Sequence, residues 1–288
     1  MGRGLSASGL GTEQPGSALV LAITRDGIAL AGRLVPLLPN AQLLAPERLR
    51  DLAEAAAPGA CQCYSGPLRA RMAALFTEFD AIVAVCSIGA LVRLIAPQLR
   101  DKHQDPAVVA LDQAGRFVIP ILSGHLGGAN ALADRLARGL GATPVLTTAS
   151  DVRQTLAVDL LGRELGWRIH ASPADLLRAS AAMVNDEPVA LMQEAGSPDW
   201  WRGHANGRTG ALPANLHCLC ASDLAGLDGA GLEAAGPNSA GWDALGLGAY
   251  RALLWISHRS PPAAISAGFS GALIHYRPPA SAAGREQA

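Results

Sequence analysis

The chain has 288 residues, 50% of them hydrophobic, and a formal net charge of −1. This is enough apolar material for a sizeable core and predicts two domains. A charge near zero gives no support for sequence-independent nucleic-acid binding, which calls for a clustered basic surface. No uncharged apolar run approaches the roughly 18 residues of a membrane helix. The N-terminal residues also lack a secretory pattern, so we expect a cytoplasmic protein that binds neither nucleic acid nor membrane.

The first part of the chain predicts a leader and then an α/β unit. Residues 1–17 are rich in Gly and Ser, which is typical of a disordered segment. The run 18–24 predicts a buried strand. A turn at Asp26-Gly27 and an amphipathic helix that ends before Pro36 or Pro39 should follow it.

The next elements continue the α/β alternation. We expect a helix over 45–57, a strand near 60–64 and a helix from about Pro67 to Phe79. Residues 81–86 are apolar on both faces, which indicates a fully buried parallel strand. A helix that reaches Ile95 should follow that strand.

A hairpin is predicted beyond this helix, with strands over 107–111 and 116–121. A short strand over 143–149 closes the first domain. The predicted fold class is therefore α/β, with an open, mostly parallel but mixed twisted sheet and flanking helices, followed by a smaller α/β domain. The expected divisions are a leader at 1–17, an N-terminal domain at 18–152, a central domain at 153–260 and a mostly disordered tail at 261–288.

The central domain is predicted from weaker signals. A helix over 154–165 should lead into it. Strands are predicted over 167–170, 189–192, 216–220 and 252–257, and residues 274–276 form a candidate edge strand. No concentrated acid/base cluster is apparent in its sequence.

Five cysteines are an odd number for a disulfide framework. Cys61 and Cys63 are two residues apart, as are Cys218 and Cys220, so each pair should share one face of a strand. His217 beside the second pair leaves zinc binding open, but the C-x-C spacing favours buried apolar thiols instead. We also expect Cys86 to be a buried apolar thiol.

The stretch 121–130 reads as a strand end, a glycine-rich turn and a helix start. Gly124, Gly127 and Gly128 allow backbone N–H groups to converge on an anion at the helix N-terminus. Ser123, His125 and Asn130 supply a hydroxyl, an imidazole and an amide there. The turn matches neither the dinucleotide fingerprint nor the phosphate loop. An alternative is that its glycines only allow a tight turn and close packing of the helix.

A second strand-turn-helix includes Ser87, Gly89 and Arg93. We expect this turn at the carboxyl edge of the sheet, where open α/β sheets bind ligands. Arg93 there can meet a carboxylate or face solvent. Lys102 is the only lysine beside 22 arginines, which suggests that this position, next to His103, requires a compact ammonium group.

Three stretches together resemble one family. Residues 87–97, 101–108 and 122–133, with Thr147-Thr148, look like the CbiG family, the cobalt-precorrin-5A hydrolases of cobalamin biosynthesis. Residues 166–189 and 255–258 are similar to that family's central domain. The resemblance covers about 18–260. Full-length members carry a further C-terminal domain, which we expect to be absent here.

The resemblance implies a cobalt-corrinoid precursor whose δ-lactone is opened by water, after which a carbon–carbon bond is cleaved and acetaldehyde is released. It also implies that cobalt arrives with the substrate, so we expect no cofactor and no protein-bound metal. A separately encoded CbiG C-terminal-domain protein, or other enzymes of the pathway, are the expected partners.

Residue chemistry suggests how this reaction is divided among the side chains. His125 is the expected base, with Ser123 and Asn130 as orienting groups. Backbone N–H groups of Gly127 and Gly128 would meet the oxyanion. The substrate-binding set is expected to converge with His125 in one pocket and comprises Ser87, Gly89, Arg93, Lys102, His103, Gly124, Gly127 and Gly128.

Three alternatives stay open at this point. Ser123 can act as an acyl nucleophile with His125 as its base, although G-x-S-x-G is absent. The chain can instead be a non-catalytic tetrapyrrole-binding or scaffold protein of the same pathway. A phosphate-ligand binding module needs only the glycine-rich turn and gives Lys102 no role.

Overall fold

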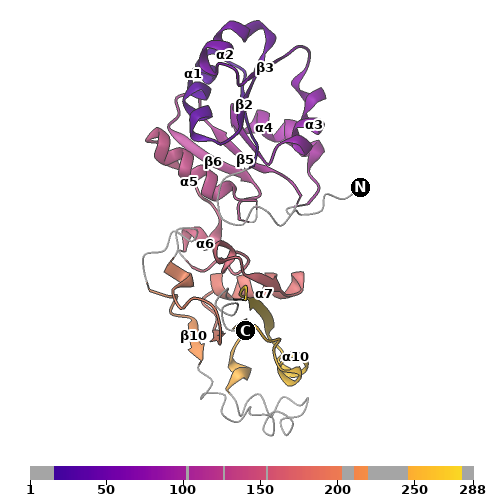
Figure 1. Ribbon diagram of the computed structural model, residues 1–288, viewed down its shortest axis with the longest axis vertical. Helices are drawn as coiled ribbons and strands as arrows, with labels where there is room; N and C mark the ends of the chain where they lie inside the picture. Colours follow the sequence, from indigo (N-terminus) through magenta and orange to yellow (C-terminus); the bar gives the residue numbers. More distant parts are fainter. Residues whose placement is uncertain are drawn as a thin grey trace, which may run out of the picture. The chain divides into compact units, whose positions relative to one another are not determined.

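The computed structural model describes residues 16–101, 104–125, 127–153, 155–202, 211–219 and 246–280. They form two compact units that divide between Thr148 and Ala149, a few residues before the predicted boundary (Figure 1). Nearly all of the predicted leader lies outside the described residues. Within these ranges no helix has the length and apolar character needed to cross a bilayer.

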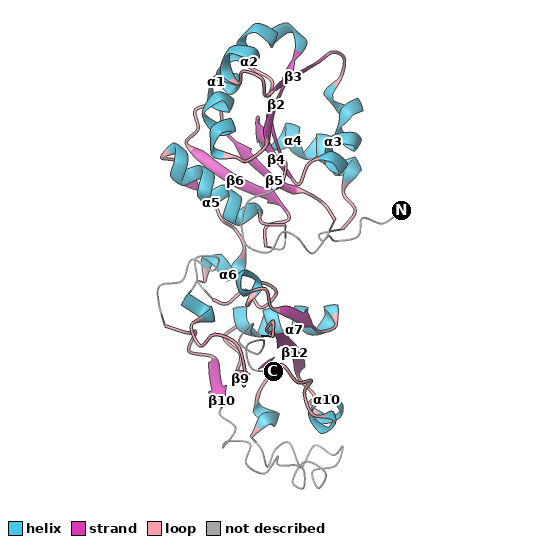
Figure 2. Cartoon of the chain, in the orientation of Figure 1, coloured by secondary structure: helices cyan, strands magenta, loops and turns pink. Residues whose placement is uncertain are grey.

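The first unit is built on a mixed 7-stranded sheet with the order β3-β2-β1-β4-β5-β6-β7 (Figure 2). Its strands are β1 (Ala18–Ala22), β2 (Ala41–Pro46), β3 (Cys61–Tyr64), β4 (Ala81–Val85), β5 (Ala107–Leu111), β6 (Phe117–Leu122) and β7 (Thr143–Pro144). Every neighbouring pair is parallel except β5 and β6, which form the predicted hairpin. The predicted α/β class and mixed sheet are confirmed.

Helices cover both faces of this sheet because its strands are apolar on both sides. The helices are α1 (Arg25–Leu34), α2 (Arg50–Ala56), α3 (Met72–Glu78), α4 (Ile88–Ile95) and α5 (Ala129–Leu140), with 3₁₀ turns η1 (Val35–Leu37), η2 (Glu47–Leu49), η3 (Leu68–Arg71) and η4 (Ala96–Gln98). α1, α2 and α5 pack on the face that carries Val20 and Val83. α3 and α4 pack on the opposite face, with Leu19 and Ile82.

The chain changes direction across the sheet between β1 and β4. The connections from β1 to β3 run through α1 and α2, and those from β3 to β5 run through α3 and α4 on the other face. The carboxyl ends of β1 and β4 are therefore neighbours whose following segments turn to opposite faces. In open α/β sheets such a switch point leaves a crevice in which ligands bind.

Two predictions for this unit are wrong. The expected turn at Asp26-Gly27 lies inside the first turn of α1, because Thr24 caps the helix and accepts the Gly27 N–H at 3.1 Å. The helix expected over 45–57 begins at Arg50, and the strand β2 precedes it. Most of β2 is buried between β1 and β3, so tertiary pairing overrides its weak local signal.

The second unit has a 5-stranded sheet with the order β10-β9-β11-β12-β8. Its strands are β8 (Arg168–His170), β9 (Val189–Gln193), β10 (Leu216–Leu219), β11 (Ala252–Ile256) and β12 (Ala272–Arg277). Its helices and 3₁₀ turns are α6 (Ala149–Val152), α7 (Pro173–Val184), α10 (Ala263–Gly268), η5 (Arg163–Leu165), η6 (Trp200–Arg202) and η8 (Leu247–Ala249). All pairs are parallel except β12 with β8.

Two predictions for this unit are also corrected. The helix expected over 154–165 is replaced by turns and η5, because Gly162 has φ +73° and a Cβ there would lie 2.2 Å from the Trp167 ring. The tail expected to be mostly disordered over 261–288 carries α10 and β12. β12 is an interior strand between β11 and β8, and the Tyr276 side chain is fully buried.

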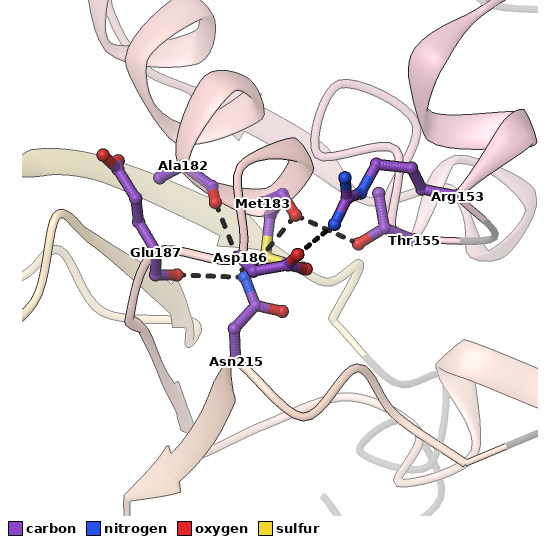
Figure 3. Close-up of polar contacts among 7 residues, drawn as sticks. All are labelled: Arg153, Thr155, Ala182, Met183, Asp186, Glu187 and Asn215. Carbon is purple, nitrogen blue, oxygen red and sulfur yellow. Dashed lines mark hydrogen bonds and ion pairs between the residues drawn. The ribbon is translucent and has the colours of Figure 1, made fainter.

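Polar contacts hold the C-terminal end of α7 (Figure 3). The Asn215 side-chain amide lies within 3.5 Å of the carbonyl oxygens of Ala182 and Met183 and donates at 2.9 Å to Glu187. An Arg153–Asp186 ion pair lies beside it. Carbonyl groups at a helix end lack intrahelical partners, and Ala182 and Met183 also accept from the Glu187 N–H and the Thr155 hydroxyl, so several donors converge on this helix end.

Candidate functional site

The glycine loop, residues 123–125 and 127–128, lies where the parallel strands of the first sheet begin. β6 runs antiparallel to β5, so Leu122 pairs with Val108 near the start of β5. Ser123 then donates through Oγ to the Asp105 carbonyl at 3.0 Å, just before β5 begins. We call this side of the sheet the amino edge and the opposite side the carboxyl edge.

Tight backbone geometry shapes the glycine loop. Ser123 has φ +57°, a left-handed conformation that costs energy for a residue with a side chain. A Cβ on Gly127 would lie 2.3 Å from the Ser123 Cβ and 2.8 Å from its carbonyl oxygen. Gly128 caps α5 with φ +83°. Glycine is therefore required at 127 by contact and favoured at 128 by conformation.

The loop amides bond within the loop itself. Gly128 N–H donates to the His125 carbonyl at 3.0 Å, and Ala129 N–H donates to the Ser123 carbonyl at 3.1 Å. Asn130 N–H donates to the Gly124 carbonyl at 3.0 Å. The expectation that Gly128 offers a free N–H to an oxyanion is therefore wrong for this conformation, because that donor already has a backbone partner.

Asn130 fixes the loop to Thr148, in the segment that follows β7 at the end of the unit. Its side chain is 9% exposed and donates through Nδ2 to the Thr148 Oγ at 2.8 Å. A Cβ on Gly124 would lie 2.8 Å from the Asn130 Oδ1, so the glycine allows the amide to approach. The His125 side chain is half-buried and thus keeps some access to solvent.

The second glycine-containing turn, Ser87 to Gly89, follows β4 at the carboxyl edge. The Ser87 Oγ accepts the Ala90 N–H at 3.4 Å and caps α4. The exposed Arg93 donates to the Gly89 carbonyl at 3.3 Å, so its guanidinium points back toward the start of the helix.

The structure separates these two turns instead of joining them in one pocket. β4 has 5 residues, so its ends lie roughly 16 Å apart at about 3.3 Å per residue. Ser87 follows its carboxyl end, while the glycine loop lies beyond its amino end. The predicted convergence of Arg93 with His125 is therefore wrong. Lys102 and His103 lie outside the described residues.

An open cleft of about 1310 Å³ lies at the carboxyl edge, at the switch point between β1 and β4. We call it the arginine cleft. Its lining includes Ile23, Pro46, Arg48, Tyr64, Arg69 and Arg93. Sequence reasoning identified only Arg93 here, because Arg48 and Arg69 lie in short 3₁₀ turns of an arginine-rich chain and carry no motif.

The Glu47 carboxylate at the arginine cleft is already paired with an arginine. Glu47 lines the cleft and accepts two hydrogen bonds from Arg50, each 2.7 Å long. That hydrogen bonding by Arg50 holds the pKa of Glu47 below its usual value. Burial raises the pKa of Tyr64, so its phenol adds no negative charge near neutral pH.

The second unit carries a polar cluster that the sequence did not reveal. Ser257 is 2% exposed and donates to a Glu194 carboxylate oxygen at 2.7 Å, and its Oγ accepts the Arg259 N–H at 3.0 Å. The His275 Nε2 lies 3.0 Å from the Ser257 carbonyl, and the centroid of the His170 ring lies 5.5 Å from that of His275, with the two rings tilted by 31°. The imidazole contacts the serine carbonyl rather than its hydroxyl, so these groups do not form a catalytic triad.

The cysteines only partly match the prediction. Cys61 and Cys63 share a strand face, with their Sγ atoms 3.8 Å apart, but both are only half-buried. Cys86 is buried, whereas Cys218 is exposed, so its predicted burial is wrong. Cys220 lies outside the described residues. Among the described residues no group of three or more His, Cys, Asp or Glu side chains is placed to hold a metal ion.

Two family models match consecutive parts of the chain. "Cobalamin synthesis G N-terminal" matches residues 70–151, and "Cobalamin biosynthesis central region" matches residues 156–278. Together they account for most of the sequence. The chain belongs to the CbiG family.

Curated relatives extend this comparison. A cobalt-precorrin-5A hydrolase of Priestia megaterium is 40% identical over 188 residues, which are 65% of this chain and 50% of that protein. A cobalt-precorrin-5A hydrolase of Salmonella typhimurium is 36% identical over 192 residues, 67% of this chain and 50% of that protein. This CbiG chain thus spans about half the length of the curated relatives it matches.

A solved structure described as a homologue of cobalamin biosynthesis protein G, from Sulfolobus solfataricus, also aligns with the chain. The TM-score is 0.43 with 18% identity, over 91% of this chain and 60% of that one. Likeness at that level supports no further conclusion. The fold described above therefore stands on the strand order and register of this CbiG chain itself.

Proposed function

We propose that this CbiG chain hydrolyses the δ-lactone of cobalt-precorrin-5A, with release of acetaldehyde. The observation that carries the proposal is the 36–40% identity to two named cobalt-precorrin-5A hydrolases over about two thirds of the chain. The substrate is a cobalt-corrinoid precursor, and because it brings the cobalt, we propose no cofactor held by the protein.

The proposed chemistry is acyl transfer to water. The water oxygen bonds to the lactone carbonyl carbon and the ring C–O bond breaks, which leaves a carboxylate and a hydroxyl. Cleavage of a carbon–carbon bond then releases acetaldehyde. The first step needs a base for the water and donors for the oxyanion.

His125 is the proposed base. Its side chain is half-buried in the glycine loop, where surrounding bonds hold the backbone in one conformation. Such a fixed loop suits a catalytic group, because a base must lie within hydrogen-bond reach of the proton that it takes. Of the two amides assigned to the oxyanion, we retain Gly127, because Gly128 donates to the His125 carbonyl.

Ser123 and Asn130 are proposed to hold the loop in place for His125. Ser123 donates to the Asp105 carbonyl at 3.0 Å, and Asn130 donates to the Thr148 hydroxyl at 2.8 Å. The bond made by Ser123 counts against its role as an acyl nucleophile, because its proton points to a carbonyl. Lys102 and His103 keep their proposed role, which is to bind carboxylate groups of the substrate at this site.

The activity is proposed either for the chain alone or for the chain together with a separate C-terminal-domain protein. An anaerobic assay of acetaldehyde release from cobalt-precorrin-5A tests both forms, with the part of the Priestia megaterium relative that this chain does not match as the added partner. We expect acetaldehyde in at least one form. Tetrapyrrole binding without acetaldehyde in either form would favour a non-catalytic scaffold protein.

His125→Ala and His125→Gln should lower acetaldehyde release by about 100-fold or more, the range typical of a missing general base. His258→Ala is the matched control, because His258 is an exposed histidine of the second unit. Substrate binding should change little in either His125 variant. Undiminished turnover in both variants would show that His125 is not the base.

A further inference from the structure

The arginine cleft lies at the switch point of the first sheet, and the proposed reaction at the glycine loop does not use it. Ile23 follows β1, and Ala90 lies in the first turn of α4 after β4. Both residues line the cleft. Open α/β sheets bind ligands at this position, and here it lies about one strand length from His125.

The cleft carries positive charge that the protein itself does not neutralise. Arg48 donates to the Ile23 carbonyl at 3.1 Å and Arg93 donates to the Gly89 carbonyl at 3.3 Å, and both acceptors are neutral. In the described part of the chain, Arg48, Arg69 and Arg93 form no ion pair. Guanidinium groups recognise carboxylates through paired N–H donors.

The rest of the lining is mainly apolar, and the cleft is large. Pro46, Pro67, Leu68 and Leu94 contribute to its walls, together with Tyr64. Its volume of about 1310 Å³ exceeds the roughly 300–1,000 Å³ of pockets that hold drug-sized ligands. A fitting ligand therefore has an extended apolar body with anionic groups at its periphery.

We propose that the arginine cleft binds a tetrapyrrole through its peripheral carboxylates, at a site separate from the glycine loop. The choice of a tetrapyrrole rests on the proposed function, whereas the demand for an apolar body with carboxylates rests on the cleft alone. Arg69 and Arg93 bind carboxylates in this site, and the apolar wall contacts the face of the macrocycle.

The cleft lies partly outside the stretch that the first family model matches. Arg48 and Arg69, with β1 to β3, precede residue 70, where the first family model begins to match. Arg93 lies inside the matched part.

The test is equilibrium binding of uroporphyrin I to the full chain, followed by the fluorescence of the porphyrin. Its apolar ring carries acetate and propionate groups, and its octamethyl ester keeps the ring without the charges. We expect uroporphyrin I to bind more tightly than both the ester and citrate, which carries carboxylates without a ring. Equal binding of the acid and the ester would overturn the proposal.

The double variant Arg69→Gln, Arg93→Gln should weaken uroporphyrin binding about tenfold at low salt, because it removes two exposed ion pairs that are each weak alone. Both side chains are exposed, so the fold should survive, as circular dichroism can verify. Arg138→Gln on α5 removes one positive charge outside the cleft, against two in the double variant, and should leave the affinity unchanged. Equal losses in the double variant and in Arg138→Gln would overturn the proposal.

His125→Ala separates this proposal from the proposed function. Because the cleft lies at the other edge of the sheet, this variant should bind uroporphyrin I as the unmodified chain does. A chain without acetaldehyde release that still binds uroporphyrin through Arg69 and Arg93 would refute the activity and leave the cleft proposal intact. Loss of uroporphyrin binding in His125→Ala would place the ligand at the glycine loop and overturn the cleft proposal.

Discussion

The two edges of the first sheet differ in how their polar groups are satisfied. At the amino edge, Ser123, Asn130 and several loop amides bond to one another and to Asp105 and Thr148. At the carboxyl edge, guanidinium groups line an open cleft without carboxylate partners among the described residues. The first arrangement fixes the position of a side chain such as His125, and the second leaves charge available to a ligand.

The largest expected effect comes from adding one methyl group at the amino edge. Gly127→Ala places a Cβ 2.3 Å from the Ser123 Cβ and 2.8 Å from its carbonyl oxygen, and overpacking of this kind costs about 1–3 kcal/mol. Gly89→Ala is the matched control at the carboxyl edge, because its Cβ meets only the Arg93 side chain, at 3.6 Å. We expect the control to leave the free energy of unfolding within about 0.5 kcal/mol.

Hydrogen exchange of the β4 to β6 amides measures the difference in stability of the first unit between Gly127→Ala and Gly89→Ala. Tryptophan fluorescence serves as an internal reference, because all five tryptophans lie at or beyond residue 167, in the second unit. Faster exchange in Gly127→Ala with unchanged fluorescence is the expected pattern. Equal stability of the two alanine variants would mean that the glycine loop is not tightly packed.

A smaller loss is expected when the bond between Asn130 and Thr148 is removed. Asn130→Ala deletes a buried donor and should lower the free energy of unfolding by about 0.5–1.5 kcal/mol, the net contribution of one typical hydrogen bond. Gln62→Ala is the control, since Gln62 bonds to the Gln42 side chain at 2.6 Å but is exposed. Urea unfolding followed by circular dichroism compares the two variants. A loss no greater for Asn130 than for Gln62 would contradict a fixed amino edge.

The smallest effect concerns thiol ionisation in β3. Burial, followed by the hydrogen bond with Cys63, raises the pKa of Cys61 to about 12 from the usual value of 9.0 for a cysteine thiol. The folded state then holds the thiol proton more tightly than the unfolded state. The contribution of the protonated Cys61 thiol to the free energy of unfolding is complete below pH 9 and is lost as the pH rises from about 9 toward 12.

Alkylation by iodoacetamide at pH 8, read by peptide mass spectrometry, compares the reactivity of the Cys61 thiol in the folded and in the unfolded chain. Cys61 should react more slowly in the folded chain than in the chain unfolded in urea, because the thiolate is the reactive form. Equal rates in the folded and unfolded chain would show that β3 does not shield this thiol.

Much of the first unit could be predicted because its strands are short apolar runs bounded by turn residues. β1, β4 and the β5–β6 hairpin all follow this pattern. β2 was missed because Gln42 interrupts its apolar run, it ends in Pro46 and it depends on its neighbours for burial. The segment after Gln154 has helical spacing, yet Gly162 and the Trp167 ring exclude a helix.

The candidate site was only partly predictable for a topological reason. The hairpin was predicted correctly, but a hairpin reverses the chain, so the loop after β6 and the turn after β4 fall at opposite edges. Grouping His125 with Arg93 was therefore wrong. Arg48 and Arg69 gave no signal, because only the fold brings these scattered arginines beside Arg93.

The antiparallel course of β6 also has a consequence for engineering. In a wholly parallel sheet, the loops that follow the strands crowd together, so a change made for one ligand tends to disturb its neighbour. Here one reversed strand carries the histidine loop to the far end of the layer. Substitutions around Arg93 and around His125 should therefore act independently. Each edge of the sheet could then be redesigned without compensating substitutions at the other.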